Sequence, residues 1–247
     1  MNILGIIPAR HASTRFPAKA LADIEGKSLV QRVYEQASKS ASLSRVLVAT
    51  DHADILNHVK AFGGEAVMTK ETHSSGTDRC DEAMMLQSES FDYVVNIQGD
   101  EPFIQPEQID LLASALDGHT EIATLVKVIR NHEQLFNPNV VKVVFNSEFN
   151  ALYFSRSTIP HLRNIAPESW LKEHTFYKHI GMYAYRTDVL RQISKLGLSS
   201  LEKAESLEQL RWLENGFHIR VIPTSQETIG VDTPDDLRKA VEFLRNQ

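Results

Sequence analysis

The sequence predicts an α/β fold with a mostly parallel central sheet and helices on both faces of that sheet. In the front half, short apolar runs alternate with amphipathic helical patterns, which is the order expected of strand–helix–strand units with right-handed crossovers. The back half contains more strands and fewer long helices. Because no flexible linker, repeat or low-complexity segment interrupts the chain, we expect a single domain over residues 1–247, with a smaller lobe or subunit contact at about 131–186.

The front half begins with the apolar run Ile3–Ile7, which ends at Pro8 and suits a buried strand. Ser28 is expected to start the first helix, with Gln31 three residues on as its capping-box partner. Further strands are expected at 45–50, 65–68 and 93–98, and further helices at 55–62, 78–86 and 106–116. This alternation is the basis for the parallel sheet.

The back half is less regular. Strands are expected at 122–128, 140–145, 151–155 and 180–186, and helices at 187–196 and 206–214. The second of these helices would begin at the Ser206-x-x-Gln209 pattern. The last helix has Thr233 as N-cap and Pro234 at its first position, and we expect the acids Asp235 and Asp236 to complement its dipole.

The overall charge constrains the kind of partner. With 26 basic and 32 acidic side chains the net charge is −6, which argues against broad nucleic-acid or membrane binding and suits a local basic patch for a small anionic ligand. The single cysteine, Cys80, cannot form an internal disulfide and is expected to pack in the core. We find neither a signal-peptide pattern nor a membrane-spanning run, so a cytoplasmic protein is expected.

A basic loop follows the first expected strand. Arg10, Arg15 and Lys19 stand among small residues, at an edge of the sheet where ligands bind in open parallel folds. The loop matches neither the Walker pattern nor G-x-G-x-x-G. Its cations and small residues could hold phosphate oxygens through side chains and backbone N–H groups, or they could form an ordinary solvated surface.

Two acids stand out as metal-ligand candidates. Asp100, in "QGDEP", directly follows an apolar strand, and Asp232 directly precedes the last helix. Carboxylates in such places are good ligands for Mg²⁺ shared with substrate phosphates, although each could instead be a turn residue. Zinc-protease spacing and the G-x-S-x-G nucleophile motif are both missing from the sequence, so a hydrolytic site is not indicated.

Motifs along nearly the whole chain resemble one family. The matching segments, in family order, are "IIPARHASTRFPAKAL", "VATDH", "SGTDR", "NIQGDEP", "NPNVVKVV", "ALYFSRSTIP", "YKHIGMYAYR", "LEQLRWLENG" and "GVDTPDDL". They resemble the 3-deoxy-manno-octulosonate cytidylyltransferases, or CMP-Kdo synthetases. The resemblance implies a Rossmann-like nucleotide-diphospho-sugar transferase fold with a strand-rich dimerisation lobe, a homodimer, and activation of the acidic eight-carbon sugar Kdo by CTP for lipopolysaccharide biosynthesis.

The same resemblance implies roles for individual residues. Arg10, Arg15 and Lys19 would hold the triphosphate, and Asp100 and Asp232 would hold Mg²⁺. The nucleotide pocket would also include Pro8, Ala9, Ser75, Gly76, Thr77 and Gln98. The sugar side would consist of Gln98, Arg156, His179, Tyr183, Glu208 and Gln209.

The basic loop departs from the family pattern, and some alternatives stay open. His11, Ala18 and Ala20 replace the Tyr, Gly and Pro that the family usually has, and Ala18 enters positive φ less freely than Gly. Tyr183 could be a core residue, and Glu208 and Gln209 could simply suit a first helical turn. A cytidylyltransferase for a related acidic sugar, such as 8-amino-Kdo or a nonulosonate, and a non-catalytic nucleotide-binding regulator are the alternative functions.

Overall fold

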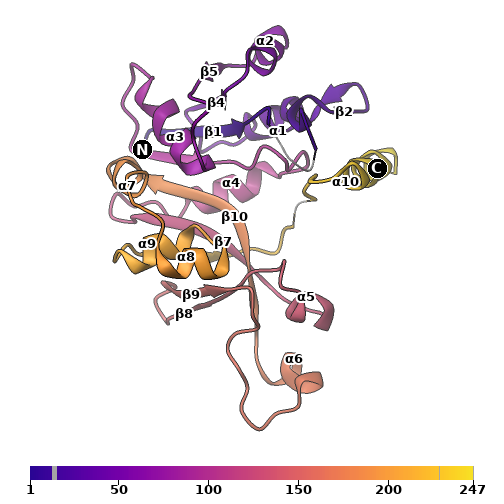
Figure 1. The fold of residues 1–247 in the computed structure, drawn as a ribbon, viewed down its shortest axis with the longest axis vertical. Helices are drawn as coiled ribbons and strands as arrows, with labels where there is room; N and C mark the ends of the chain where they lie inside the picture. The colour runs from indigo at the N-terminus through magenta and orange to yellow at the C-terminus, as the bar shows by residue number, and fades with distance from the viewer. Residues whose placement is uncertain (13–15, 228, 247) are drawn as a thin grey trace. The chain divides into compact units, whose positions relative to one another are not determined.

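The computed structural model describes residues 1–12, 16–227 and 229–246 (Figure 1). The chain divides into two compact units, Met1–Ala113 with Thr228–Gln247, and Ser114–Glu227. The irregular region expected at 131–186 lies wholly inside the second unit, which is larger than that region. The single domain expected from the sequence stays a prediction.

The first unit is built on parallel strands in the order β6-β1-β4-β5. These strands are β1 (Ile3–Ala9), β4 (Arg45–Thr50), β5 (Ala66–Met68) and β6 (Tyr93–Asn96). In their register, Ile6 pairs with Leu47 on one side and with Asn96 on the other, and every pairing is parallel. Leu4, Ile6 and Ile7 are fully buried, as expected for a central strand covered on both faces.

Helices and a short hairpin complete the first unit. The helices are α1 (Leu29–Ala37), α2 (Ala53–Ala61), α3 (Gly76–Met85), α4 (Pro106–Ala113), α10 (Pro234–Arg245) and the 3₁₀ turn η1 (Lys19–Leu21), and the hairpin is β2 (Asp23–Ile24) with β3 (Lys27–Ser28). Ser28 caps α1 as predicted, because its hydroxyl accepts a hydrogen bond from the Gln31 amide. Thr233 and Asp236 form the capping box of α10.

The second unit is a mixed sheet with short helices. Its strands are β7 (Ile122–Val128), β8 (Lys142–Phe145), β9 (Ala151–Ser155), β10 (Tyr177–Arg186) and β11 (Ile219–Pro223), of which β11 and β7 are parallel while the pairs β7–β10, β10–β8 and β8–β9 are antiparallel. Its helices are α5 (His132–Phe136), η2 (Pro167–Ser169), α6 (Trp170–Glu173), α7 (Thr187–Ile193), α8 (Ser200–Glu205) and α9 (Gln209–Glu214). Trp212, Tyr185 and Phe154 are among its largest buried side chains.

The predicted start of the helix at 206–214 is wrong. Two helices occupy this region, and Ser206 ends the first of them in the left-handed conformation, with φ 52°. The capping box belongs instead to Ser199 and Glu202, a Ser-x-x-Glu pattern seven residues earlier. Glu208 and Gln209 nevertheless lie at the start of α9.

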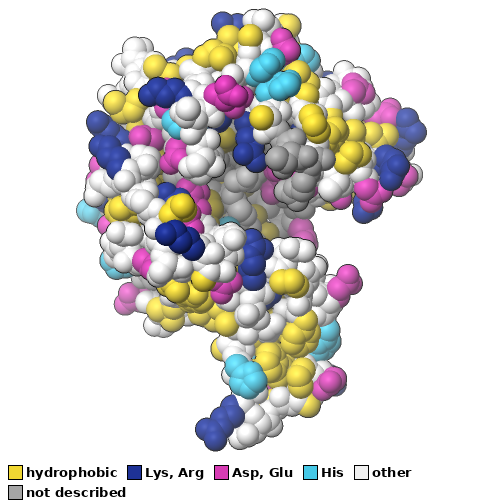
Figure 2. Space-filling view, in the orientation of Figure 1, with side chains coloured by type: hydrophobic (Ala, Val, Ile, Leu, Met, Phe, Trp, Pro, Cys, Tyr) yellow, Lys and Arg dark blue, Asp and Glu magenta, His cyan; other side chains and the backbone are white. Residues whose placement is uncertain are grey.

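Other expectations concern burial and surface charge. Cys80 is fully buried, which confirms that it packs in the core. Across the part of the chain that the structure describes, no helix is long and apolar enough to span a bilayer. Basic and acidic side chains are interspersed on the face drawn in Figure 2, in keeping with the small net charge.

Candidate functional site

A cleft of about 370 Å³ lies in the first unit, where the chain leaves the carboxyl ends of β1 and β6. Its walls include most of the residues predicted for the nucleotide and the metal, namely Pro8, Ala9, Arg10, Lys19, Ser75, Gly76, Gln98, Asp100 and Asp232. Thr77 is buried and is not part of these walls. Arg15 lies outside the described residues.

The centre of the cleft is a lysine held between two carboxylates. The Lys19 ammonium donates to Asp100 Oδ2 at 2.9 Å and to Asp232 Oδ1 at 3.0 Å. Burial opposes the charge of Lys19, but the two carboxylates outweigh that effect and raise the pKa of the lysine. The Asp100 carbonyl also accepts from the Val231 amide at 2.8 Å, so backbone and side chains both join these distant segments.

This carboxylate pair fits a divalent metal ion. Asp100 and Asp232 offer hard oxygen ligands, the kind that Mg²⁺ prefers. Both carboxylates already lie within hydrogen-bond distance of one cationic group, the Lys19 ammonium, so they are close enough to share a cation. Their role as metal ligands stays a prediction, whereas their convergence beside Lys19 is a property of the structure.

Gly99 allows the strand ends to approach closely. A Cβ atom built on Gly99 would lie 2.6 Å from the Pro8 carbonyl oxygen, which is closer than real Cβ contacts. Only glycine therefore fits between the end of β1 and the turn that carries Asp100. This requirement accounts for the Gly in "QGDEP".

The N-terminus of α3 contributes to another wall of the cleft. Ser75 caps this helix, because its hydroxyl accepts from the Asp78 amide at 3.1 Å, and Gly76 is the first helical residue. Unpaired N–H groups and the positive end of the helix dipole favour anions at such a position. Ser75 and Gly76 are thus placed where a phosphate or a polar nucleotide group could be bound.

A buried ion pair that the sequence analysis did not single out supports the basic loop. Asp51 accepts from the Arg79 guanidinium at 2.8 Å and from the His11 amide at 3.0 Å. The side chains of Arg79 and Asp51 are only 3% and 7% exposed. The pair fixes the backbone directly after Arg10. The motifs "VATDH" and "SGTDR" contain both residues, but nothing in either segment alone pairs them.

Ala18 adopts the conformation that the sequence analysis expected to be difficult. Its φ and ψ are 53° and 26°, which is left-handed, and its amide donates to the His11 carbonyl at 3.2 Å. A left-handed alanine costs roughly 1–2 kcal/mol relative to the right-handed form. The turn that precedes Lys19 therefore includes a residue in a conformation that Gly would adopt more easily.

In the second unit, the predicted sugar-side residues differ in how many of their polar atoms already form hydrogen bonds within the protein. The Arg156 guanidinium donates to the carbonyls of Glu205, Ser206 and Pro138, so its N–H groups serve largely to hold this loop. His179 pairs through Nε2 with the Thr124 hydroxyl at 3.0 Å. Burial lowers the pKa of His179 to about 3, so this imidazole is neutral near pH 7.

The hydroxyl group of Tyr183 is not explained if this residue serves only to fill the core. Its side chain is buried among aromatic rings, including His179 and Trp212, as a core residue would be. Its hydroxyl, however, has no hydrogen-bond partner among the described residues. Because buried hydroxyls are nearly always paired, this atom is suited to receive a ligand. Burial raises the pKa of Tyr183 well above its ordinary value, so the group is a neutral donor.

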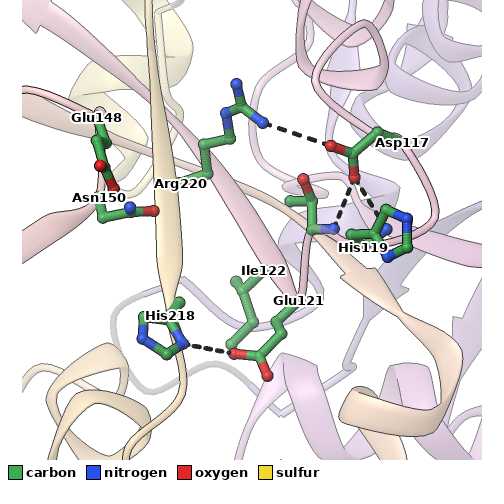
Figure 3. A pocket seen from close by; sticks show the side chains of 9 residues that line it. Asp117, His119, Glu121, Ile122, Glu148, Asn150, His218 and Arg220 are labelled. Atoms are coloured by element: carbon green, nitrogen blue, oxygen red, sulfur yellow. Dashed lines mark hydrogen bonds and ion pairs between the residues drawn. The ribbon is translucent and has the colours of Figure 1, made fainter.

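Another pocket, of about 460 Å³, lies in the second unit (Figure 3). Two of its carboxylates are already partnered, because Asp117 accepts from the amides of His119 and Thr120, and Glu121 pairs with His218. It is an open, mixed-charge surface hollow that contains none of the predicted site residues. The cleft around Lys19 is therefore the candidate functional site.

Comparisons with known proteins show the family to which the chain belongs. Residues 4–226 match the family model described as Cytidylyltransferase, which makes the chain a cytidylyltransferase by class. The chain is 58% identical over 252 residues to the 3-deoxy-manno-octulosonate cytidylyltransferase of Parabacteroides distasonis and 59% identical over 251 residues to that of Bacteroides thetaiotaomicron, each match covering 100% of both chains. The chain belongs to the 3-deoxy-manno-octulosonate cytidylyltransferase family.

A solved structure is also closely similar. It is titled as CMP:2-keto-3-deoxy-manno-octonic acid synthetase complexed with CTP, has a TM-score of 0.92 and 42% sequence identity, and the match covers 100% of this chain and 99% of the other. The nucleotidyltransferase fold predicted from the sequence is confirmed.

Proposed function

We propose that this chain transfers the cytidylyl group of CTP to 3-deoxy-manno-octulosonate (Kdo). The anomeric hydroxyl oxygen of the sugar forms a bond to the α-phosphorus of CTP, and the bond from that phosphorus to the bridging oxygen of the β-phosphate breaks. The hydroxyl proton is lost, and the products are CMP-Kdo and pyrophosphate. The observation that carries the proposal is the convergence of Lys19, Asp100 and Asp232 in the cleft of the first unit.

The nucleotide would be bound by the basic loop and the N-terminus of α3. Arg10 and Lys19 supply positive charge, and the N–H groups near Gly76 supply neutral donors. The Asp51–Arg79 pair fixes the backbone amide of His11, which keeps Arg10 in position. Phosphoryl transfer depends mainly on such positioning and charge neutralisation, so a separate nucleophilic residue is not required.

We propose Asp100 and Asp232 as the residues that hold Mg²⁺. When bound, the ion would neutralise phosphate charge and lower the pKa of the attacking hydroxyl. Lys19 offsets half of the charge of the two carboxylates, and its ammonium can equally pair with a phosphate oxygen.

The sugar would be recognised by residues of the second unit. The unpaired Tyr183 hydroxyl can donate to a sugar oxygen, and Glu208 and Gln209 can bond sugar hydroxyls. Because His179 is neutral, it suits a hydroxyl better than it suits the sugar carboxylate. We propose that the sugar carboxylate pairs with Arg156. Its guanidinium keeps its positive charge although its N–H groups donate to carbonyls. The homodimer and the cytoplasmic location stay predictions.

A turnover assay tests this function. Pyrophosphate release would be measured with each of the four nucleoside triphosphates against Kdo, with Mg²⁺ and with a chelator. We expect release with CTP and Mg²⁺ only. Comparison of Kdo with its 8-amino analogue and with a nonulosonate separates the alternative sugars, and tight CTP binding without product would favour the non-catalytic regulator.

A further inference from the structure

A cluster of nitrogen and oxygen donors stands in the first unit apart from the Asp100–Asp232 pair. His11 follows β1, His52 is the N-cap residue of α2, and Asp54 is in the first turn of that helix. One ligand atom from each residue lies within 4.8 Å of the others. The two imidazole rings are stacked, with centroids 3.8 Å apart and planes 16° apart.

The chemistry of these donors selects a different ion from the one expected beside Lys19. Two imidazoles and a carboxylate are typical ligands of Zn²⁺ and of neighbouring transition metals, whereas Mg²⁺ prefers oxygen ligands alone. The geometry points to a transition-metal site formed by His11, His52 and Asp54, with Zn²⁺ as the expected ion and water at the remaining position. This site is separate from the one we propose for catalysis.

Two of the three side chains, those of His52 and Asp54, are exposed enough to move towards an ion. Ligands of one Zn²⁺ at roughly 2.0–2.2 Å lie about 3–3.6 Å apart, so the donors must draw together and the rings must turn out of their stack. Asp54 is 70% exposed and His52 is 39% exposed, so neither movement disturbs the core.

His52 already uses one ring nitrogen as a hydrogen-bond acceptor. Its Nδ1 accepts from the Asp54 amide at 3.2 Å and lies 3.6 Å from Asp54 Oδ2. A metal ion at this nitrogen would take the place of the N-cap hydrogen bond.

An ion at this site would act on the basic loop. The His11 amide donates to Asp51, and the His11 carbonyl accepts from the Ala18 amide. A metal ion would add a side-chain link from His11 to the start of α2, directly beside Arg10. We expect the bound ion to stiffen this end of the loop and thereby to change the KM for CTP more than kcat. That kinetic effect rests on the proposed function, but ion binding does not.

Metal titration of the intact chain tests the site directly. Zn²⁺ binding would be followed by calorimetry, and Co²⁺ binding by its visible absorption, in excess Mg²⁺ so that all-oxygen sites are filled. We expect one Zn²⁺ or Co²⁺ per chain. His11→Tyr, which introduces the residue usual in the resembled family, and His52→Asn, which keeps an N-cap acceptor, should each weaken binding by about tenfold or more.

The matched control is His218→Gln, which removes a histidine from another exposed His–carboxylate pair, with Glu121. This variant should bind like the original chain. Equal affinity in the original, His11→Tyr and His52→Asn chains would overturn the proposal, as would the absence of stoichiometric binding in the original chain. Because these measurements need neither CTP nor sugar, they distinguish failure of the metal site from failure of the proposed function.

Discussion

Gly99→Ala should damage the cleft because the structure leaves no room for a side chain there. The added Cβ would lie 2.6 Å from the Pro8 carbonyl oxygen, and an ordinary contact of 3.4–4 Å requires about 0.8–1.4 Å more. The obstacle is backbone rather than a flexible side chain, so either β1 or the Asp100 turn must move. Hydrogen bonds tolerate only roughly 2.7–3.2 Å between donor and acceptor, so such a shift disrupts the Asp100–Lys19 bond of 2.9 Å.

Two magnitudes follow from this displacement. Insertion of a methyl group into a packed site typically costs about 1–3 kcal/mol of unfolding free energy. A misplacement approaching 1 Å in a catalytic arrangement can lower kcat/KM by about 10²-fold. We expect a loss of tenfold to 10²-fold here, together with a higher Mg²⁺ requirement, measured as pyrophosphate release from CTP and Kdo over a Mg²⁺ titration. Urea denaturation would give the stability.

Gly197→Ala is the matched control, because no atom lies within 4 Å of the Cβ that it adds. Its stability should change by no more than about 1 kcal/mol, and its Mg²⁺ dependence should be unchanged. If Gly99→Ala had the stability and the Mg²⁺ requirement of the original chain, the close approach of β1 and the Asp100 turn would not be what positions the carboxylate.

The remaining predictions concern the carboxylate pair, the left-handed turn and a buried histidine. Asp100→Asn should abolish Mg²⁺-dependent pyrophosphate release while the chain stays folded by circular dichroism, since an amide is a poor ligand for Mg²⁺. Ala18→Gly should raise the unfolding free energy by up to about 1 kcal/mol in urea, because relief of the left-handed strain exceeds the entropy that Gly adds to the unfolded chain. The unfolding free energy should fall by up to about 1.4 kcal/mol per pH unit as the pH drops from 6.5 towards about 3. The reason is that His179 takes up a proton in the unfolded chain but not in the folded one. His179→Gln should therefore flatten this slope.

Each of these predictions can fail clearly. Near-normal turnover of Asp100→Asn would remove this residue as a metal ligand. A destabilised Ala18→Gly chain would mean that the left-handed conformation is not strained. An equally steep acid slope in His179→Gln would assign the pH dependence to other groups.

The sequence predicted best those features that depend on neighbouring residues. The strand at Arg45–Thr50 and the caps at Ser28 and Thr233 are local, because apolar runs and capping residues act within a few positions. The helix start at Ser206 was wrong because Ser199 offers an equivalent pattern, and only tertiary packing decides between them. Two capping patterns of similar strength do not by themselves show which of them starts a helix.

Long-range pairings were beyond a local analysis. Asp51 and Arg79 are 28 positions apart, and their ion pair exists only because the fold brings β4 and α3 together. The carbonyl bonds of Arg156 likewise depend on the left-handed turn at Ser206. Convergence of Asp100 and Asp232 could be anticipated because the motifs of a known family were present, not because spacing required it.

The segment "GVDTPDD" shows that a structural role and a functional role can depend on each other. The sequence analysis gave Asp232 two alternative roles, metal ligand or turn residue, and expected Asp235 and Asp236 to complement the helix dipole. In the structure, Asp236 accepts from the amides of Asp232 and Thr233, which fixes the backbone on one side of the Asp232 carboxylate. On the other side, Val231 is fully buried and its amide donates to the Asp100 carbonyl. The cap that starts α10 therefore also holds Asp232 beside Asp100, so a loss of the cap should weaken the carboxylate pair as well as the helix.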